Sequence, residues 1–441
     1  MRPFPFQIEG LRAIDYTFDG RSLIAWDMGL GKTLTTLWYT QRRERWPALV
    51  VCPSTLKWVW EREARRIGID DVAVIQGRGA LGESLPGTKL TIINYDVLSY
   101  WKKRLTKKNL GMLIFDECQF LKNHTAKRTK AARSISRKSR RLLALSGTPI
   151  LNRPIELWPV LNMIDPIRFN SRFRFAQRYC DPKSNGFGMD YSGASNIEEL
   201  NELLLDSVMI RKRKLEVIKE LPQKMRQVVP IDMENPIEYE RADDDFIGWL
   251  QEVSPDKVQG AKKAKAVVKV GELLRLAARL KLKATIEWVN NFLEDGDKIV
   301  LFARHKFVIK ELHNAFHKSV VVDGSVTGKR RMAAVDKFQK GNANVLIGQI
   351  DAAGVGLTLT AAADVAFIEL PWQPGAVTQA EDRCWRIGQD RTVWIHYLVA
   401  VDTIEERLCS ILQDKQEVVD AILDGKKVDG SLDVWDLLLR S

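Results

Sequence analysis

The sequence predicts an α/β protein with two parallel sheets, each covered by helices on both faces. Short apolar, β-branched runs alternate with helix-like stretches up to Leu145, which is the rhythm of strands joined by crossover helices. This alternation stops after Pro154 and resumes beyond Lys283, so a second sheet of the same class is expected. With 441 residues and 45% apolar content, the chain is long enough for two domains that each bury a core.

The expected strands are short apolar or β-branched runs. In the first half they are 23–26, 48–52, 72–75, 90–95, 112–115 and 142–145. In the second half they are 299–303, 345–347, 365–370 and 393–399. The region 154–283 is mostly helical in period and is interrupted by an irregular stretch at 181–195. A last helix over 403–423 has apolar residues at helical spacing, which is typical of a helix that packs on a core.

A candidate phosphate-binding loop follows the first expected strand. Residues 27–33 read DMGLGKT and lead into an expected helix at 34–43. Glycines let backbone amides turn inward, a helix N-terminus favours anions, and a lysine at this place reaches the outer phosphates. Lys32 is therefore the expected phosphate ligand, and Thr33 would hold a magnesium ion. The strict loop pattern asks for glycine where this chain has Trp26.

Two adjacent carboxylates end the expected strand at 112–115. Asp116 and Glu117 follow its carboxyl end, which is where parallel sheets bind ligands. Asp116 can orient a magnesium shell, and Glu117 can accept a proton from an attacking water. A surface Asp-Glu pair usually has no function. Because this pair ends a buried strand downstream of a phosphate loop, the catalytic interpretation is favoured.

The stretch 379–389, QAEDRCWRIGQ, places two arginines three residues apart. On one helix, residues at that spacing share a face, so Arg383 and Arg386 are expected to point the same way. Two guanidiniums aimed together suit a polyphosphate, because each offers a planar set of donors that stays charged. We therefore expect one active site, built from this stretch and the distant loop at 27–33.

The charge balance favours a polyanionic partner. Lysine and arginine number 68 against 56 acidic residues, which gives a net charge of +12. The run 127–141, KRTKAARSISRKSRR, contains no acid, and a second basic concentration lies at 257–269. A solvated basic face is the alternative interpretation of such a run.

Cysteine and hydropathy patterns exclude several classes of protein. The 5 cysteines include no C-x-x-C pair, so neither a zinc module nor a disulfide framework is indicated. No apolar run reaches the roughly 18 residues that span a bilayer, and the N-terminus lacks the apolar block of a secretory signal. The chain is expected to act away from membranes, in the compartment where it is made.

With the loop, the carboxylate pair and QAEDRCWRIGQ in this order, the chain resembles the Swi/Snf family of helicase-like ATPases in helicase superfamily two. VVCPSTLKWVWERE at 50–63, LSGTPILN at 145–152, VDGS at 322–325 and GVGLTLTA at 354–361 resemble further motifs of that family. The second half resembles most the branch of annealing helicases and fork remodellers, and only the motor core is expected here. The family's own phosphate loop also lacks the first glycine. Where the family usually has Asp-Glu-x-His, this chain departs with Gln119.

The resemblance implies two tandem RecA-like domains, at 1–220 and 221–441. Helical protrusions are implied near 155–210 and 235–285, together with a brace helix at the C-terminal end. ATP and Mg²⁺ are the implied cofactors.

The resemblance also assigns residues to the implied site. The catalytic residues are Lys32, Asp116, Glu117, Arg383 and Arg386. The nucleotide ligands are Gln7, Gly29, Gly31, Lys32, Thr33, Gly356 and Gln379, and Thr33 and Asp116 serve the metal. The nucleic-acid contacts are Pro53, Ser54, Asn94, Thr148, Arg304, Ser325 and Thr358.

The function that the resemblance implies is that of an ATP-dependent translocase on double-stranded DNA, which remodels DNA or DNA–protein complexes. Two alternatives stay open: a strand-separating DNA or RNA helicase, and a non-catalytic DNA-binding scaffold. Double-stranded or branched DNA is the expected partner, with a targeting protein as a second candidate. A monomer is expected, located in the cytoplasm, on the nucleoid of a prokaryote or virus, or in the nucleus of a eukaryote.

Overall fold

Two compact units make up the chain. The computed structural model describes residues 2–78, 87–150, 153–184, 189–191, 193–218, 221–246, 248–249, 265–295, 297–326, 328–353 and 357–424. The first unit is Met1–Glu220 together with the end of α19 (Ile404–Asp424), from Gln416 on. The second unit begins at Leu221 and runs to Lys415. Each unit is built on its own parallel sheet.

A seven-stranded parallel sheet forms the centre of the first unit. Its order is β3-β4-β2-β5-β6-β1-β9. The strands β2, β4, β5 and β6 are buried along their whole length, which is why their sequences are continuous apolar runs. The bounds are β1 (Arg21–Trp26), β2 (Ala48–Cys52), β3 (Val72–Val74), β4 (Leu90–Asn94), β5 (Met112–Asp116), β6 (Leu142–Leu145) and β9 (Met209–Lys212).

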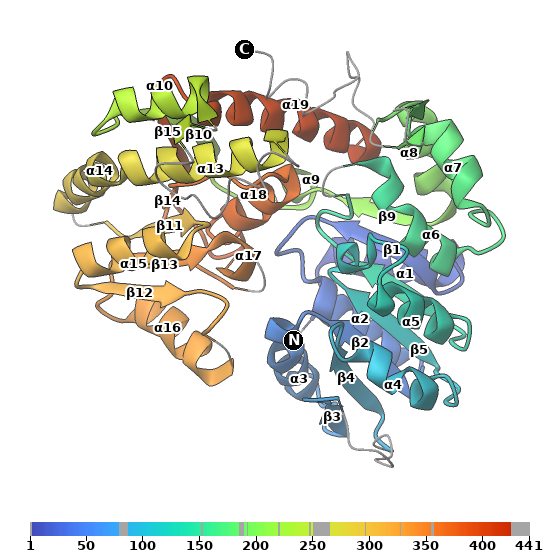
Figure 1. The fold of residues 1–441 in the computed structure, drawn as a ribbon. Helices are drawn as coiled ribbons and strands as arrows, with labels where there is room; N and C mark the ends of the chain where they lie inside the picture. Colours follow the sequence, from blue (N-terminus) through green and yellow to red (C-terminus); the bar gives the residue numbers. More distant parts are fainter. Residues whose placement is uncertain are drawn as a thin grey trace. The chain divides into compact units, whose positions relative to one another are not determined.

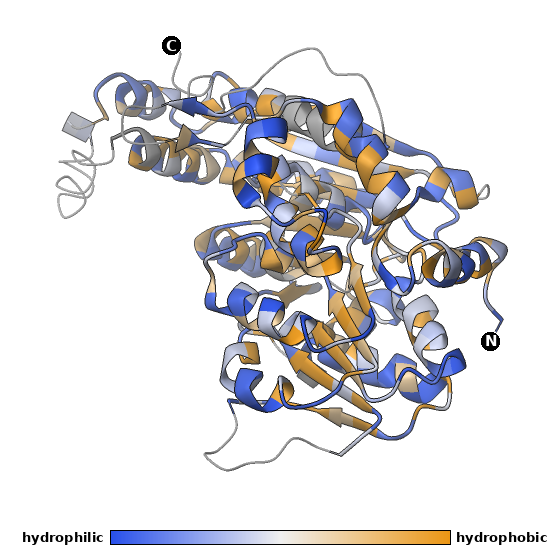
Figure 2. Cartoon of the chain, turned by 90° about the vertical axis from the view of Figure 1, so that its right-hand side faces the viewer, coloured by the Kyte–Doolittle hydropathy of each residue, from blue (hydrophilic) through white to orange (hydrophobic). Residues whose placement is uncertain are grey.

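Helices cover both faces of this sheet (Figure 1). The connection from β1 to β2 and the connection from β5 to β6 cross the sheet in opposite directions, so right-handed crossovers place their helices on opposite faces. Accordingly, α2 packs against α3, and α4 packs against α5. In Figure 2 the strands are coloured hydrophobic, whereas the helices carry hydrophilic residues on their outer surfaces. The bounds are α1 (Pro5–Tyr16), α2 (Lys32–Arg42), α3 (Lys57–Arg66), α4 (Leu98–Leu105) and α5 (Lys127–Ser136).

The rest of the first unit is mainly helical. It contains α6 (Trp158–Ile164), α7 (Arg172–Tyr179), α8 (Ile197–Ser207) and α9 (Lys214–Val217). Two predictions for this region are wrong in detail. The stretch expected to be irregular contains an antiparallel pair, β7 (Lys183–Ser184) and β8 (Met189–Asp190). The region expected to be helical also contains β9, which pairs with β1 and adds a seventh strand.

A six-stranded parallel sheet forms the centre of the second unit, in the order β10-β15-β14-β11-β13-β12. The expected strands are present, and β10 and β12 are two that the sequence analysis missed. The strand bounds are β10 (Lys224–Ile231), β11 (Ile299–Ala303), β12 (Ser319–Val322), β13 (Val345–Gln349), β14 (Asp364–Phe367) and β15 (Val393–Ala400). The helix bounds are α10 (Pro236–Asp244), α13 (Lys265–Leu280), α14 (Leu282–Glu294), α15 (Lys306–Ala315), α16 (Gly328–Lys340), α17 (Ile350–Ala353) and α18 (Pro374–Glu381).

The predicted fold class, an α/β protein with two parallel sheets, is confirmed. The last predicted helix is also confirmed as α19, on which Leu408, Ile411 and Ile422 are buried. Within the described ranges, no helix is long and apolar enough to cross a membrane.

Candidate functional site

The carboxyl ends of five neighbouring strands gather the predicted site residues of the first unit. The strands β4, β2, β5, β6 and β1 are adjacent and run in the same direction, so the loops that follow them share one edge of the sheet. In that strand order the edge carries Asn94, then Pro53 and Ser54, then Asp116 and Glu117, then Thr148, and finally the loop 27–31. The topology thus joins segments that are far apart in the sequence.

The loop after β1 has the backbone of a phosphate-binding turn. Gly29 and Gly31 have φ values of 85° and 76°, which glycine adopts without strain. Gly31 is also the N-cap of α2, and a Cβ atom at this position would lie 2.4 Å from Gln7 Nε2. Gln7 Nε2 donates a hydrogen bond to the Leu30 carbonyl at 3.1 Å. Gln7, a predicted nucleotide ligand, therefore lies directly against the loop.

Lys32 and Thr33 occupy the first turn of α2, where a helix N-terminus favours anions. Lys32 Nζ donates to the carbonyls of Trp26 and Asp27, at 2.8 and 3.2 Å. The first loop residue, Asp27, is itself fixed by Arg211, whose Nη1 lies 2.8 Å from Asp27 Oδ1. Arg211 belongs to β9, a strand that the sequence did not predict. For that reason the contact between Arg211 and the loop was not predicted either.

Trp26, which replaces the first glycine of the strict loop pattern, is a core residue. Its side chain is fully buried at the end of β1 and meets Phe6 of α1 edge-on, with ring centroids 5.8 Å apart. Gly10 of α1 leaves room for the indole, because a Cβ atom there would lie 2.3 Å from the Trp26 ring. The departure from the pattern thus serves the packing of α1.

Asp116 and Glu117 are both buried at the end of β5. Burial and the adjacent charge of Glu117 raise the pKa of Asp116 to about 7, although a hydrogen bond from Trp60 and the charge of Lys32 act to lower it. Two buried carboxylates side by side disfavour each other's ionised form, and a bound cation relieves that cost. Buried carboxylate oxygens therefore suit the predicted magnesium ion, for which Asp116 at the end of β5 and Thr33 on the phosphate loop remain the candidate protein ligands.

A chain of hydrogen bonds connects Thr148 to Glu117, and each group donates to the next in that direction. Gln119 Nε2 donates to Glu117 Oε2 at 2.8 Å, and Gln119 Oε1 accepts from Ser146 Oγ at 2.8 Å. Ser146 Oγ in turn accepts from the backbone N–H of Thr148 at 3.0 Å. All four residues are buried. Gln119, the departure from the family pattern, thus links the predicted base to a predicted nucleic-acid residue.

The nucleic-acid residues predicted in the first unit differ in exposure. Ser54 is exposed just beyond β2, whereas Asn94 and Thr148 are buried. Asn94 Nδ2 donates to Asp96 Oδ2 at 3.0 Å. Ser54 can therefore meet a ligand directly, while Asn94 and Thr148 shape the backbone of the same edge.

In the second unit, the prediction that 379–389 forms one helix is wrong. Helix α18 ends at Glu381, and the residues that follow form successive turns in which Cys384 N–H bonds to the Glu381 carbonyl at 3.2 Å. The two arginines nevertheless converge. Arg383 Nη1 and Arg386 Nη1 both donate to the Leu357 carbonyl, at 3.4 and 3.1 Å.

The paired guanidiniums favour an anion. Burial, followed by repulsion from Arg383, lowers the pKa of Arg386 to about 10. A phosphate group beside the pair would relieve both effects. Of the two predicted nucleotide ligands in this unit, Gln379 is buried on α18 and its carbonyl accepts from Arg383 Nε at 3.0 Å. Gly356 lies outside the described residues.

Two residues close to the arginines in sequence, Glu381 and Trp385, hold the start of β10. Glu381 is fully buried and binds Lys224 Nζ at 2.9 Å and both Nε and Nη2 of Arg226, at 2.9 and 2.7 Å. Trp385 Nε1 donates to the Pro222 carbonyl at 2.8 Å, and Lys224 Nζ lies 4.6 Å from the centre of its ring. Trp385, for which the sequence suggested no role, thus fixes the first residues of this unit beside Arg383 and Arg386.

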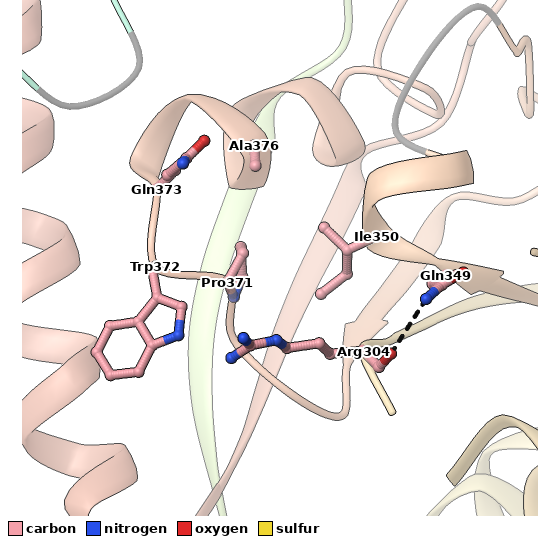
Figure 3. A pocket seen from close by; sticks show the side chains of 7 residues that line it. All are labelled: Arg304, Gln349, Ile350, Pro371, Trp372, Gln373 and Ala376. Carbon is pink, nitrogen blue, oxygen red and sulfur yellow. Dashed lines mark hydrogen bonds between the residues drawn. The ribbon is translucent and has the colours of Figure 1, made fainter. Parts of the chain in front are cut away.

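The nucleic-acid residues predicted in the second unit lie beyond the carboxyl ends of its strands. Arg304 follows β11 and lines a pocket of about 190 Å³, in which its guanidinium extends toward Trp372 (Figure 3). Ser325 follows β12, is exposed, and donates to Asp323 Oδ1 at 2.6 Å. Thr358 is exposed next to the Leu357 carbonyl that holds the arginines. The other residues that line the pocket are Gln349, Ile350, Pro371, Gln373 and Ala376.

The chain is similar to two curated proteins over almost its whole length. It is 34% identical to the DNA annealing helicase and endonuclease ZRANB3 of Mus musculus, over 96% of this chain and 41% of that protein. It is 36% identical to the SWI/SNF-related matrix-associated actin-dependent regulator of chromatin subfamily A-like protein 1 of Xenopus laevis, over 94% of this chain and 43% of that protein. The chain therefore spans less than half the length of these relatives. A solved structure, the Sulfolobus solfataricus SWI2/SNF2 ATPase core in complex with dsDNA, is similar with a TM-score of 0.47 and 25% identity, over 100% of this chain and 95% of that one.

Two family models match consecutive parts of the chain. The SNF2-related domain matches residues 13–274, which is more than half of the sequence. The helicase conserved C-terminal domain matches residues 281–388, which include both arginines of the candidate site. These matches confirm the resemblance on which the sequence analysis relied. The chain belongs to the SNF2-related family and carries its ATP-hydrolysing core together with a helicase C-terminal domain.

Proposed function

We propose that this ATPase is a translocase on double-stranded DNA, and that it remodels DNA or DNA–protein complexes. The support comes from the arrangement of the first unit and from the relatives, one of which is named as a DNA annealing helicase. The chain is expected to work as a monomer, with a targeting protein as a second partner besides double-stranded or branched DNA.

The first unit supplies the groups that bind ATP and activate water. The amides of the loop 27–31 and the ammonium of Lys32 hold the phosphates. Thr33 and Asp116 would hold Mg²⁺, which would neutralise negative charge on the phosphates. Glu117 accepts the proton of the attacking water, and Gln119 keeps one oxygen of that carboxylate fixed.

Arg383 and Arg386 stabilise the charge that develops on the transferred phosphate. Guanidiniums placed in this way act as arginine fingers in phosphoryl transfer. Since they belong to the second unit and the phosphate loop to the first, hydrolysis requires both units. The change of bound phosphate on hydrolysis is the proposed source of movement along DNA.

One observation carries the dependence on DNA: the hydrogen-bonded chain from Glu117 through Gln119 and Ser146 to Thr148. A ligand that moves the backbone at Thr148 changes the position of the base through three hydrogen bonds. We expect the grip on DNA to be made mainly to phosphates, and therefore to be independent of sequence and sensitive to salt.

The direct test is ATP hydrolysis with three nucleic acids. Duplex DNA should stimulate turnover more than single-stranded DNA or RNA, without strand displacement. Displacement together with stimulation by single strands would instead support a strand-separating helicase. Absence of hydrolysis with every nucleic acid, despite DNA binding, would support the non-catalytic scaffold.

Arg386→Ala tests whether the second unit takes part in hydrolysis. Turnover should fall by roughly 10³- to 10⁵-fold, the range attributed to arginine fingers, while ATP binding stays near wild type. Arg391→Ala is the matched control, because Arg391 lies five positions further along and its guanidinium pairs with Asp297 at 2.8 Å, away from the Leu357 carbonyl. Near-wild-type turnover in Arg386→Ala would contradict the shared site.

A further inference from the structure

Fixed protein donors hold both oxygens of the Asp116 carboxylate. Trp60 Nε1 donates to Oδ2 at 2.7 Å, and the backbone N–H of Glu117 donates to Oδ1 at 3.0 Å. The Trp60 side chain is fully buried on α3, the helix that follows β2. The backbone carbonyl of Asp116 also accepts a hydrogen bond from the Tyr95 hydroxyl at 2.8 Å. The carboxylate is therefore held in one orientation by the indole of α3 and by the backbone that directly follows β5.

An indole N–H is suited to orient a metal-binding carboxylate. It is neutral and can only donate, so it neither takes the proton of the acid nor competes as a ligand for a cation. The ring is rigid and has few rotatable bonds, and burial on α3 leaves it little freedom. A hydrogen bond of this kind fixes one oxygen while the other lone pairs remain available to a metal or its water shell.

Burial of a tryptophan does not by itself explain this contact. In the described part of the chain, the indole N–H groups of Trp26, Trp158 and Trp249 are buried without any hydrogen-bond partner. The fold thus tolerates unsatisfied indoles elsewhere. At Trp60 the indole meets the acidic side chain that the site provides for magnesium.

We propose that Trp60 is a positioning residue for magnesium, acting through the carboxylate of Asp116. This inference rests on the proposed function, because it takes Asp116 as the magnesium ligand of an ATP site. The indole does not touch the nucleotide or the metal. Its effect should therefore appear in the dependence of nucleotide binding on magnesium, and not in the affinity for nucleotide alone.

Trp60→Phe removes the N–H and keeps an aromatic ring. Binding of a fluorescent, non-hydrolysable ATP analogue to the full chain is measured while Mg²⁺ is titrated. The Mg²⁺ concentration at half-maximal binding should rise roughly 10- to 100-fold, as expected for loss of a group that orients a metal ligand. Binding of the analogue without Mg²⁺ should stay at the wild-type level. Trp58→Phe, on the same helix but 39% exposed, is the matched control and should leave both quantities unchanged.

Superimposable Mg²⁺ titrations for Trp60→Phe and wild type would overturn the proposal. Trp60→Met is a second variant, since methionine fills irregular buried space and also lacks the N–H; it should shift the titration in the same direction. If neither variant binds the analogue without Mg²⁺, Trp60 is required for the nucleotide site to fold, and the positioning role is rejected. Failure of the proposed function would give a different result, because the wild-type protein itself would then bind no analogue at any Mg²⁺ concentration.

Discussion

Gln119 is the residue at which this chain departs from its family's usual motif, and its contacts give it a definite role. Its amide N–H holds Glu117, and its carbonyl oxygen holds Ser146. A hydrogen bond to a charged group contributes about 1.5–3 kcal/mol, and about 1.4 kcal/mol of transition-state stabilisation is tenfold in rate. Gln119→Leu should therefore lower ATP turnover roughly 10- to 100-fold in steady-state assays with duplex DNA, with little change in KM for ATP.

Gln119→His is the control for this change, because histidine is the residue that the family resemblance leads us to expect at this position. It can bond to both neighbours, and turnover should stay within a few-fold of wild type. Equal losses in the leucine and histidine variants would show that the two hydrogen bonds do not matter individually. Full activity in Gln119→Leu would separate Gln119 from catalysis.

At the scale of single residues, the sequence predicts candidate site residues where the chemistry is local. Lys32, Asp116 and Glu117 could be assigned because each follows directly from a strand and the turn after it. Trp60 and Arg211 could not, because their importance comes from contacts with residues more than fifty positions away. The one signal for Trp60 was its place within a motif that resembles the family, and nothing in that motif indicates that its N–H meets Asp116.

The element that joins α18 to β15 shows how tertiary contacts override a local spacing rule. Arg383 and Arg386 were expected to converge because of helical periodicity, yet they converge in turns after α18 has ended. Gln389 explains why the chain need not continue as a helix. Its side-chain amide donates to the carbonyls of Thr360, Ala362 and Cys384, at 3.3, 2.8 and 3.3 Å. No spacing rule on QAEDRCWRIGQ contains the distant carbonyls of Thr360 and Ala362.

The contact between α18 and β10 should make the folded state of the second unit less stable at low pH. Burial by itself raises the pKa of Glu381, but the charge of Lys224 and hydrogen bonds from Arg226 and Tyr397 outweigh it, and the pKa falls to about 2 from its ordinary value of 4.5. A lowered pKa stabilises the folded state at pH values above 4.5, and this contribution is lost as the pH falls toward 2. Its size is about 3 kcal/mol at neutral pH.

Glu381→Gln should therefore lower the free energy of unfolding at pH 7, and the gap to wild type should narrow as the pH falls below 4.5. Denaturant unfolding at a series of pH values measures both effects. Glu406→Gln is the control, because Glu406 is exposed on α19 and its loss should change stability little at any pH. A gap that stays constant with pH would mean that the ionised form of Glu381 is not what stabilises the contact.

At the scale of the whole molecule, the missed strands of the two large sheets share one property. In the sheet orders, β9, β10 and β12 all lie at an edge, whereas every predicted strand except β3 lies in the interior. Interior strands of parallel sheets are buried on both faces and read as continuous apolar runs. β10 is mostly exposed and contains Pro230, which an edge strand tolerates because its N–H side need not pair. Hydrophobic pattern thus predicts the centre of such a sheet better than its borders.

Sheet topology also divides the basic run 127–141 between two opposite edges. α5 begins beyond the carboxyl end of β5, and it ends before β6 starts, where Leu110 and Ser139 form a bridge at the amino ends of the strands. Lys127 and Lys130, both exposed, belong to the beginning of α5, on the edge that carries Asp116 and Thr148. Arg137 and Lys138, also exposed, belong to the far edge. Lys127 and Lys130 therefore lie on the edge at which DNA is proposed to bind, whereas Arg137 and Lys138 do not.

Neutralising Lys127 and Lys130 to glutamine should therefore weaken duplex binding and flatten its dependence on salt. Each phosphate contact that is lost lowers the slope of log affinity against log salt by about 0.9, so a decrease of roughly 2 is expected. Arg137→Gln with Lys138→Gln removes the same charge from the same basic run, just after α5 ends, and should leave the slope at its wild-type value. Equal decreases of the salt slope in the two double variants would mean that net charge, and not position on the sheet edge, governs DNA binding. An unchanged slope in both variants would mean that the run 127–141 is only a solvated basic face.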